Sequence, residues 1–242
     1  MTRLLIVDDS ELALDLLADA ISRDLGWDVT TVPRPDELAD HLGPDKPVDV
    51  GVVDLSFPNS SLNGLDALLA LHEQAPDCKL VVYTQGDLAM GGLLRDAWDA
   101  FELATALSKS TPIRAVLRAL RQVGTTGTAP VDPVLQPLLP AERSPWRSID
   151  GYGRLVGHAG HAKLWQALID LDEEPSYKEL ADHTGLSLRS VRNYRSELLG
   201  DLALHYLERP RMRQMQLFAK RCRPLLAPHI RRKLHGEADR GA

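Results

Sequence analysis

The sequence predicts a protein of two parts: a doubly wound α/β domain with a five-stranded parallel sheet, followed by an all-α domain. Three observations predict it. Short aliphatic runs alternate with helical patterns in the first half, as in βα units whose parallel strands are buried on both faces. In the second half, apolar residues recur at helical spacing. The length of 242 residues suits two compact domains of about 100–150 residues each.

Five aliphatic runs mark the expected strands. They are LLIV (4–7), VTTV (29–32), VGVV (50–53), LVVY (80–83) and the weaker ATAL (104–107). Leucines at helical spacing lie between the runs, and the last helix is expected to begin with Thr111 as its N-cap and Pro112 as its first residue. We expect five βα repeats, which end the first domain, residues 1–123, at about Val123.

Residues 124–145 are rich in Pro, Gly and Thr, and this composition predicts a semi-extended linker. The second domain then covers residues 146–242. Residues 1–123 carry 10 Lys and Arg against 20 Asp and Glu, whereas residues 186–233 carry 12 basic residues against 3 acidic ones. An acidic first half joined to a basic last third suggests a control module coupled to a part that meets a polyanion.

Several classes of protein are disfavoured. No apolar run approaches the roughly 20 residues that span a bilayer, and the start, MTRLLIVDDS, turns acidic where a signal peptide would stay apolar. We therefore expect a cytoplasmic protein that does not enter the membrane. Cys78 and Cys222 lie far apart without a paired spacing, so neither a disulfide framework nor a zinc site is suggested by them.

Polar residues follow four of the five expected strands. Asp8 and Asp9 follow the first, Asp54 the third, Thr84 the fourth and Lys109 the fifth. Functional residues of an open parallel sheet gather past the carboxyl ends of its strands, so these side chains should meet. Three carboxylates there need a cation, and oxygen ligands without His or Cys favour Mg²⁺. A carboxylate nucleophile, a metal and a lysine are the parts that transfer a phosphoryl group.

The segments LLIVDDS, VVDLSFP, VVYT and ALSKS resemble the motifs of the receiver (CheY-like) family of two-component response regulators, which has a flavodoxin-like fold, over essentially all of residues 1–123. The resemblance implies that Asp54 accepts the phosphoryl group. It also implies that Asp9, Asp54 and the backbone carbonyl of Ser56 ligate Mg²⁺, with Asp8 acting through water. Thr84 would be the switch hydroxyl, and Lys109 would pair with the phosphate.

Taken singly, these residues have simpler explanations. Asp8 and Asp9 could cap the first helix, Thr84 could be a turn residue, and Lys109 a solvated charge. The chain also departs from the receiver pattern in three places: the insertion NSSLN (59–63), Ser110 where proline is common, and Ala106 where an aromatic residue often lies. These departures concern the coupling to the second domain, whereas the pocket residues are all present.

In the second domain, residues 177–196 fit a helix-turn-helix, with Ala181 at the helix crossing, Gly185 at the turn and Ser187 as N-cap. The expected core residues are Leu180, Leu186, Val191 and Tyr194, with Thr184 as one polar exception. The outward side chains that can reach DNA are Arg189, Arg192, Asn193 and Ser196. The run YKELADHTGLSLRSVRNYRSELLG resembles the helix-turn-helix of LuxR/NarL-type regulators. A sigma-factor-like or winged module with LALHYLERP as wing, or an ordinary helical hairpin with solvated arginines, stays open.

Together these observations predict a response regulator that a sensor histidine kinase phosphorylates and that regulates transcription by binding double-stranded DNA as a homodimer. We expect no stand-alone enzyme activity. One alternative is an atypical, phosphorylation-independent receiver whose output half binds a protein such as RNA polymerase. Another is a nucleotide- or metal-dependent hydrolase, but acids follow the first strand where such an enzyme needs a glycine-rich loop. Basic residues 209–233 could contact phosphates or pack on the core, and Pro224 and Pro228 are expected to interrupt a long helix.

Overall fold

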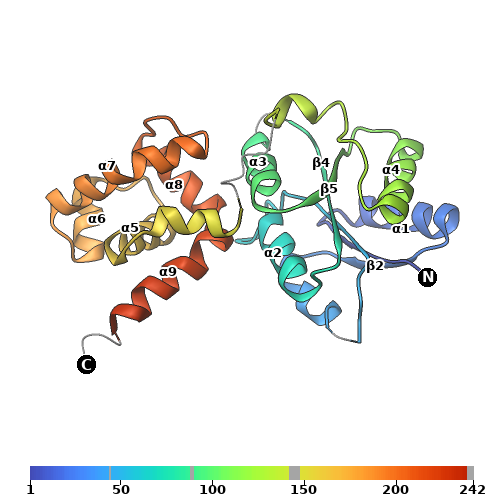
Figure 1. The fold of residues 1–242 in the computed structure, drawn as a ribbon, viewed down its shortest axis with the longest axis horizontal. Helices are drawn as coiled ribbons and strands as arrows, with labels where there is room; N and C mark the ends of the chain where they lie inside the picture. Colours follow the sequence, from blue (N-terminus) through green and yellow to red (C-terminus); the bar gives the residue numbers. More distant parts are fainter. Residues whose placement is uncertain (44, 88–89, 142–147, 239–242) are drawn as a thin grey trace. The chain divides into compact units, whose positions relative to one another are not determined.

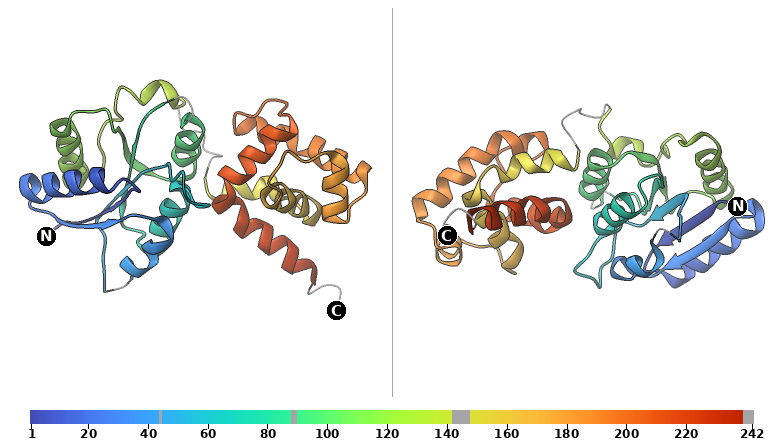
Figure 2. Two further views of the ribbon diagram at one scale, coloured as in Figure 1. Left: turned by 180° about the vertical axis from the view of Figure 1, so that it is seen from behind. Right: turned by 60° about the horizontal axis from the view of Figure 1, so that its bottom comes forward.

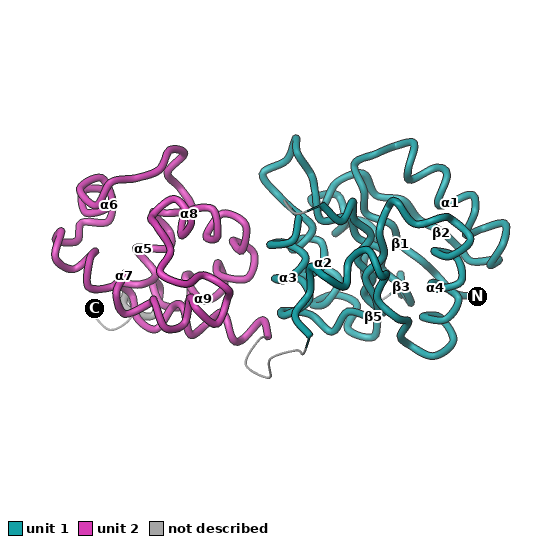
Figure 3. The backbone as a smooth tube through the Cα atoms, turned by 90° about the horizontal axis from the view of Figure 1, so that it is seen from above, with its two compact units in different colours: residues 1–144 teal, residues 145–242 magenta. Residues whose placement is uncertain are grey.

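The computed structural model describes residues 1–43, 45–87, 90–141 and 148–238. The chain divides into two compact units, residues 1–144 and 145–242, which are coloured teal and magenta in Figure 3. The first unit is α/β and the second is helical (Figure 1 and Figure 2). The predicted fold class is therefore confirmed. None of the helices in the described ranges is both long and apolar enough to span a bilayer.

A parallel sheet with the strand order β2-β1-β3-β4-β5 forms the centre of the first unit. The strands are β1 (Arg3–Val7), β2 (Asp28–Val32), β3 (Val50–Val53), β4 (Lys79–Thr84) and β5 (Leu103–Ser108). Each predicted aliphatic run lies inside its strand. Leu4 of β1 pairs with Val29 of β2 and with Val50 of β3. Because every pairing is parallel, the carboxyl ends of all strands lie at one edge of the sheet.

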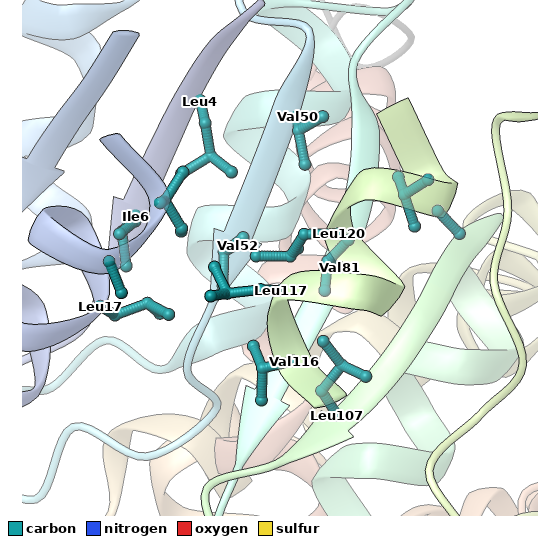
Figure 4. Packing of buried hydrophobic residues seen from close by; sticks show 14 of the residues in the cluster. Leu4, Ile6, Leu17, Val50, Val52, Val81, Leu107, Val116, Leu117 and Leu120 are labelled. Carbon is teal, nitrogen blue, oxygen red and sulfur yellow. The ribbon is translucent and has the colours of Figure 1, made fainter. Parts of the chain in front are cut away.

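Helices cover both faces of this sheet (Figure 1). They are α1 (Glu11–Leu25) and α4 (Ile113–Thr126) on one face, and α2 (Gly64–Gln74) and α3 (Gly91–Ala100) on the other. Alternate strand residues such as Leu4, Ile6 and Val52 pack with Leu117 and Leu120 of α4 (Figure 4). The connection between β2 and β3 is a 3₁₀ helix, η1 (Pro35–His41), where a fifth α-helix was expected.

The structure differs from the sequence prediction after α4. This helix continues to Thr126. Residues 128–139, here called the linker segment, fall in the stretch that was expected to form a semi-extended linker, and part of this segment lies along β5. The amides of Ala129 and Asp132 donate to the carbonyls of Ala104 and Ala106 at 3.0 and 2.9 Å. Leu135, next to the short 3₁₀ helix η2 (Gln136–Leu138), is fully buried. β5 is an edge strand, so its outer backbone groups need partners, and the linker segment supplies them.

The second unit is built from one 3₁₀ helix and five α-helices within the described residues. They are η3 (Asp150–Val156), α5 (Ala159–Asp170), α6 (Tyr177–Thr184), α7 (Leu188–Leu204), α8 (Met212–Arg221) and α9 (Arg223–Ala238). Trp165, Tyr152 and Phe218 are fully buried at its centre, and the Trp165 indole donates to the carbonyl of Leu155 at 2.7 Å.

The two prolines of the C-terminal region differ in their effect. The helical stretch breaks at Cys222, between α8 and α9, and Pro224 lies in the first turn of α9, so this proline marks a helix boundary as expected. The expectation for Pro228 is wrong, because this residue lies inside α9, where its missing N–H removes a single helical hydrogen bond. The segment LALHYLERP does not form a wing either: α7 extends through Leu204, and residues 148–238 contain no strand.

Candidate functional site

Three carboxylates and one ammonium meet at the carboxyl edge of the sheet. Ligand oxygens of Asp8, Asp9 and Asp54 all lie within 4.8 Å of one another. Lys109 Nζ lies 2.7 Å from Asp8 Oδ2 and 2.7 Å from Asp54 Oδ2. Asp8 and Asp54 are 2% and 4% exposed, whereas Asp9 is open to solvent. The parallel register produces this cluster, since β1 and β3 are neighbours and the Asp54 amide donates to the carbonyl of Val7 at 2.9 Å.

The charges of this pocket are not balanced within the protein. Burial raises the pKa of Asp54 above its ordinary value, although the hydrogen bond and ion pair with Lys109 oppose the shift. Burial would lower the pKa of Lys109, but its hydrogen bonds to Asp54 and Asp8 outweigh burial and raise it. The lysine is therefore fully charged at neutral pH. Three carboxylates beside one ammonium form a donor set made of oxygens only, as Mg²⁺ prefers, and a divalent cation would offset their negative charge.

Thr84, the last residue of β4, is fully buried, and its hydroxyl has no hydrogen-bond partner among the described residues. The backbone joins it to the lysine, because the Lys109 amide donates to the Thr84 carbonyl at 2.8 Å. Ser56 is half-buried in the loop that follows Asp54. The structure thus brings the sequence-predicted pocket residues of four strands to one edge.

The inserted loop returns directly to Asp54. Asn63 caps α2 through a capping box with Asp66, so the longer loop still ends in a regular helix start. A Cβ atom on Gly64 would lie 2.3 Å from the carbonyl oxygen of Asp54 and 2.6 Å from the Cα atom of Leu55. Only glycine permits this close approach, and the loop therefore holds Asp54 in place by direct backbone contact.

Sequence reasoning missed Asp132 of the linker segment, which is 6% exposed. Its carboxylate accepts hydrogen bonds from the Val134 amide at 2.9 Å, from the Ser108 amide at 3.5 Å and from the Thr111 hydroxyl. The last bond also explains why Thr111 does not cap α4: the N-cap residue is Pro112, without a side-chain cap. The one sequence signal for Asp132 is that it precedes a proline, which is a general turn signal.

A helix-turn-helix forms in the second unit as predicted. Gly185 ends α6 in the left-handed conformation, with φ of 69°, and Ser187 caps α7 by accepting from the Ser190 amide at 3.0 Å. Leu180 and Val191 are fully buried between the helices, and Leu186 and Tyr194 are half-buried. The polar exception, Thr184, is satisfied because its hydroxyl donates to the Leu180 carbonyl at 2.6 Å.

The four residues predicted to reach DNA all lie exposed on α7. They are Arg189, Arg192, Asn193 and Ser196. The Arg192 guanidinium lies 5.5 Å from the centre of the Tyr177 ring, a distance at which a cation–π interaction orients the side chain. The Ser196 hydroxyl donates to the carbonyl of Arg192 at 3.0 Å, so its proton is already engaged in a hydrogen bond within α7.

Comparison with known proteins decides the class of the first unit. Residues 4–101 match the family model described as the response regulator receiver domain. The first unit contains a receiver domain. The match stops before Lys109, but the structure brings this lysine into the receiver pocket through β5.

Solved structures resemble the chain over both units. One is RcsB from Salmonella enterica serovar Typhimurium bound to promoter rprA with the phosphomimetic BeF₃⁻, at 15% identity over 90% of this chain and 98% of that chain, with a TM-score of 0.52. Another shows two RcsB dimers bound to two parallel DNAs, at 16% identity over 81% and 89%, with a TM-score of 0.50. At this identity the likeness shows a receiver fold followed by a helical unit. No curated protein matched the sequence.

Proposed function

We propose that this protein is a two-component response regulator: a histidine kinase phosphorylates Asp54, and the second unit binds double-stranded DNA and regulates transcription. One observation carries the proposal. Lys109 Nζ bridges Asp8 and Asp54 at 2.7 Å each inside a receiver domain. This arrangement pairs a buried carboxylate nucleophile with a fixed cation.

The chemistry follows from the pocket. A carboxylate oxygen of Asp54 attacks the phosphorus of a phosphohistidine whose other ring nitrogen carries a proton, the P–N bond breaks, and the histidine leaves as a neutral imidazole. Lys109 can shift from the carboxylates to a phosphoryl oxygen, and the hydroxyl of Thr84 gains the partner that it lacks in the unmodified protein. Mg²⁺, held by Asp9, Asp54 and the Ser56 carbonyl with Asp8 acting through water, would offset charge on the phosphoryl oxygens.

The test is incubation of the full chain with Mg²⁺ and a small phosphodonor, followed by a phosphate-affinity gel. The wild-type band should shift, and Asp54→Asn should abolish the shift. Asp15→Asn is the matched control, because Asp15 is exposed on α1 and is not one of the clustered carboxylates, so this variant should leave the shift unchanged. An unshifted wild-type band, or a shift that persists in Asp54→Asn, would refute Asp54 as the acceptor.

DNA binding is proposed from α7. This helix follows the tight turn at Gly185 and presents Arg189, Arg192 and Asn193 to solvent, as the recognition helix of a helix-turn-helix does. The solved RcsB structures with a similar fold are bound to DNA. Phosphorylation would shift a pre-existing equilibrium, so that two copies of the chain engage adjacent half-sites.

Fluorescence anisotropy with mixed genomic duplexes measures this binding. Removing two phosphate or base contacts in the double variant Arg189→Ala/Arg192→Ala should weaken DNA binding at least tenfold and lower the salt dependence, since each phosphate contact adds about 0.9 to the slope of log K against log salt. Lys163→Ala is the control, because Lys163 is exposed on α5. If the wild type does not bind at low salt, the alternative of a protein partner such as RNA polymerase replaces the DNA proposal.

The linker segment is the proposed route from the pocket to the second unit. Ser108 precedes Lys109 and donates its amide to Asp132, while Gly86, two residues after Thr84, lies against Leu135. A Cβ atom on Gly86 would come within 2.6 Å of Leu135 Cδ2. Both switch residues are therefore within two positions of a contact with residues 128–139. Movement of Thr84 and Lys109 toward a phosphoryl group would change these contacts.

A further inference from the structure

A second cluster of metal-ligating side chains lies in the second unit, far along the chain from the acidic pocket. His158 is the N-cap of α5, His161 lies in its first turn, and Glu197 lies on α7. Glu197 Oε2 is 3.0 Å from His161 Nε2 and 3.4 Å from His158 Nε2. One ligand atom from each of the three residues lies within 4.8 Å of the other two. Two imidazoles and a carboxylate therefore converge on one point.

The spacing of these atoms suits a tetrahedral ion. Zinc binds histidine nitrogen and carboxylate oxygen at about 2.0–2.2 Å, which places two tetrahedral ligands about 3.3–3.6 Å apart. The distances from Glu197 Oε2 to His161 Nε2 and to His158 Nε2, 3.0 and 3.4 Å, are close to this range. Two histidines and one carboxylate also leave a fourth position for water, and nitrogen ligands select zinc-class ions over Mg²⁺.

The rings are already held in place. The two imidazole centres are 3.8 Å apart, and Tyr194 packs edge-on against both, at 4.8 and 5.5 Å. A Cβ atom on Gly160 would lie 2.4 Å from the Tyr194 ring, so glycine is needed to admit it. His161 is 7% exposed, and its Nδ1 atom has no partner among the described residues. Burial and the neighbouring His158 lower the pKa of His161, which keeps its ring neutral and able to ligate. The side chains of His158 and Glu197 are 45% and 52% exposed, so an ion can enter.

We propose that His158, His161 and Glu197 bind a divalent transition-metal ion of the zinc class. The ion would tie the start of α5 to α7, the helix that is proposed to contact DNA. It would also neutralise a carboxylate that lies four residues after Asn193 on that helix. This consequence for DNA rests on the proposed function, whereas the metal site itself does not.

Metal binding should remove the helix cap that His158 provides for α5, and this loss can be measured. His158 Nδ1 accepts hydrogen bonds from the amides of Gly160 and His161 at 3.0 and 3.4 Å, so the proton of the neutral ring is on Nε2. Coordination through Nε2 moves that proton to Nδ1, and the helix cap is lost. Metal should therefore raise the hydrogen exchange rate of the Gly160 and His161 amides while it stabilises the unit as a whole.

The experiment uses the full chain with Mg²⁺ in excess, which keeps the acidic pocket occupied. Zn²⁺ is titrated by calorimetry, and Co²⁺ by its visible absorption, which is stronger in four-coordinate sites. His158→Ser is the sharpest variant, because serine can still cap α5 but cannot replace the imidazole, and Glu197→Gln is a second, exposed variant. His183→Gln is the control, since His183 faces a single carboxylate, that of Asp170, at 4.0 Å.

We expect one Zn²⁺ per wild-type chain, at least tenfold weaker binding in both site variants and no change in the control. Absence of Zn²⁺ binding in the presence of Mg²⁺, or equal binding by wild type and the site variants, would overturn the proposal. DNA affinity is then measured with and without Zn²⁺, and we expect it to rise at least threefold in wild type but not in Glu197→Gln. A protein that binds Zn²⁺ and no DNA would refute the proposed function and leave the metal site standing.

Discussion

The hydroxyl of Thr84 provides a test of the proposed switch that needs no kinase. Thr84 is fully buried and its Oγ1 atom has no partner within the described ranges. A buried, unpaired hydroxyl costs roughly 1–3 kcal/mol. Valine keeps the branched shape that suits a strand and removes the hydroxyl. Thr84→Val should therefore raise the free energy of unfolding of the unphosphorylated receiver by about 1–2 kcal/mol, which corresponds to a melting temperature higher by about 3–6 °C.

The same variant should respond less to phosphorylation. In the phosphorylated receiver the hydroxyl would donate to a phosphoryl oxygen, and hydrogen bonds to charged groups contribute about 1.5–3 kcal/mol. Differential scanning calorimetry with and without Mg²⁺ and beryllofluoride measures both effects. Beryllofluoride should raise the melting temperature of the wild type by several degrees more than that of Thr84→Val.

A matched control is available on the neighbouring strand. Thr105 is 1% exposed, and its hydroxyl donates to the Pro130 carbonyl at 2.9 Å. Thr105→Val removes a satisfied hydroxyl and leaves that carbonyl unpaired, so it should destabilise the receiver by about 1 kcal/mol. If Thr84→Val were also destabilising, the hydroxyl would not be unpaired in the resting protein. If beryllofluoride stabilised Thr84→Val as much as wild type, Thr84 would not be the switch hydroxyl.

Four further predictions concern the receiver and the linker segment, with one control variant in the second unit. Lys109→Met should lower the free energy of unfolding by about 3–5 kcal/mol in urea at neutral pH, because two buried carboxylates lose their ammonium partner. Added Mg²⁺ should restore most of this stability, and a variant that Mg²⁺ does not stabilise would contradict the metal site. Burial raises the pKa of Asp54, so the folded state holds this proton more tightly than the unfolded state and stability falls as pH rises above about 4. Asp54→Asn should then stabilise the metal-free protein more at pH 7 than at pH 4, and equal effects would refute this. Gly64→Ala should lower the melting temperature and the phosphorylation rate, since the added Cβ atom meets the backbone of Asp54 and Leu55. The control is Gly200→Ala on α7, where the Cβ atom has open space, and this variant should raise the free energy of unfolding by about 0.5–1 kcal/mol. Asp132→Asn should speed amide exchange in the linker segment, and unchanged exchange would mean that this carboxylate does not hold the segment.

The strands and the acidic pocket could be predicted because their signals are local. A parallel strand buried on both faces is a continuous aliphatic run, so LLIV and VGVV mark β1 and β3 to within a residue. The order of parallel strands then brings the residues that follow them to one edge, which is why Asp8 and Asp54 meet although they are distant in sequence. Composition could not place the linker segment, since its contacts with β5 are non-local and Pro-rich stretches carry no periodicity.

The departures from the receiver pattern become consistent once the linker segment is considered. Ala106 is fully buried, and its carbonyl accepts a hydrogen bond from the Asp132 amide. The backbone of the position that often holds a mobile aromatic residue is thus paired with the linker segment.

Ser110 fits the same arrangement. Its amide donates to the Ser108 hydroxyl at 3.2 Å, and the two hydroxyls lie 2.7 Å apart. Proline at this position would lack that amide. Ser108 in turn donates its own amide to Asp132 and lies next to Lys109. The residues that replace the usual aromatic and proline are therefore those that join the acidic pocket to the linker segment. If Asp54 is phosphorylated as proposed, the coupling would run through the linker segment, which precedes the second unit in the chain, in place of an aromatic side chain.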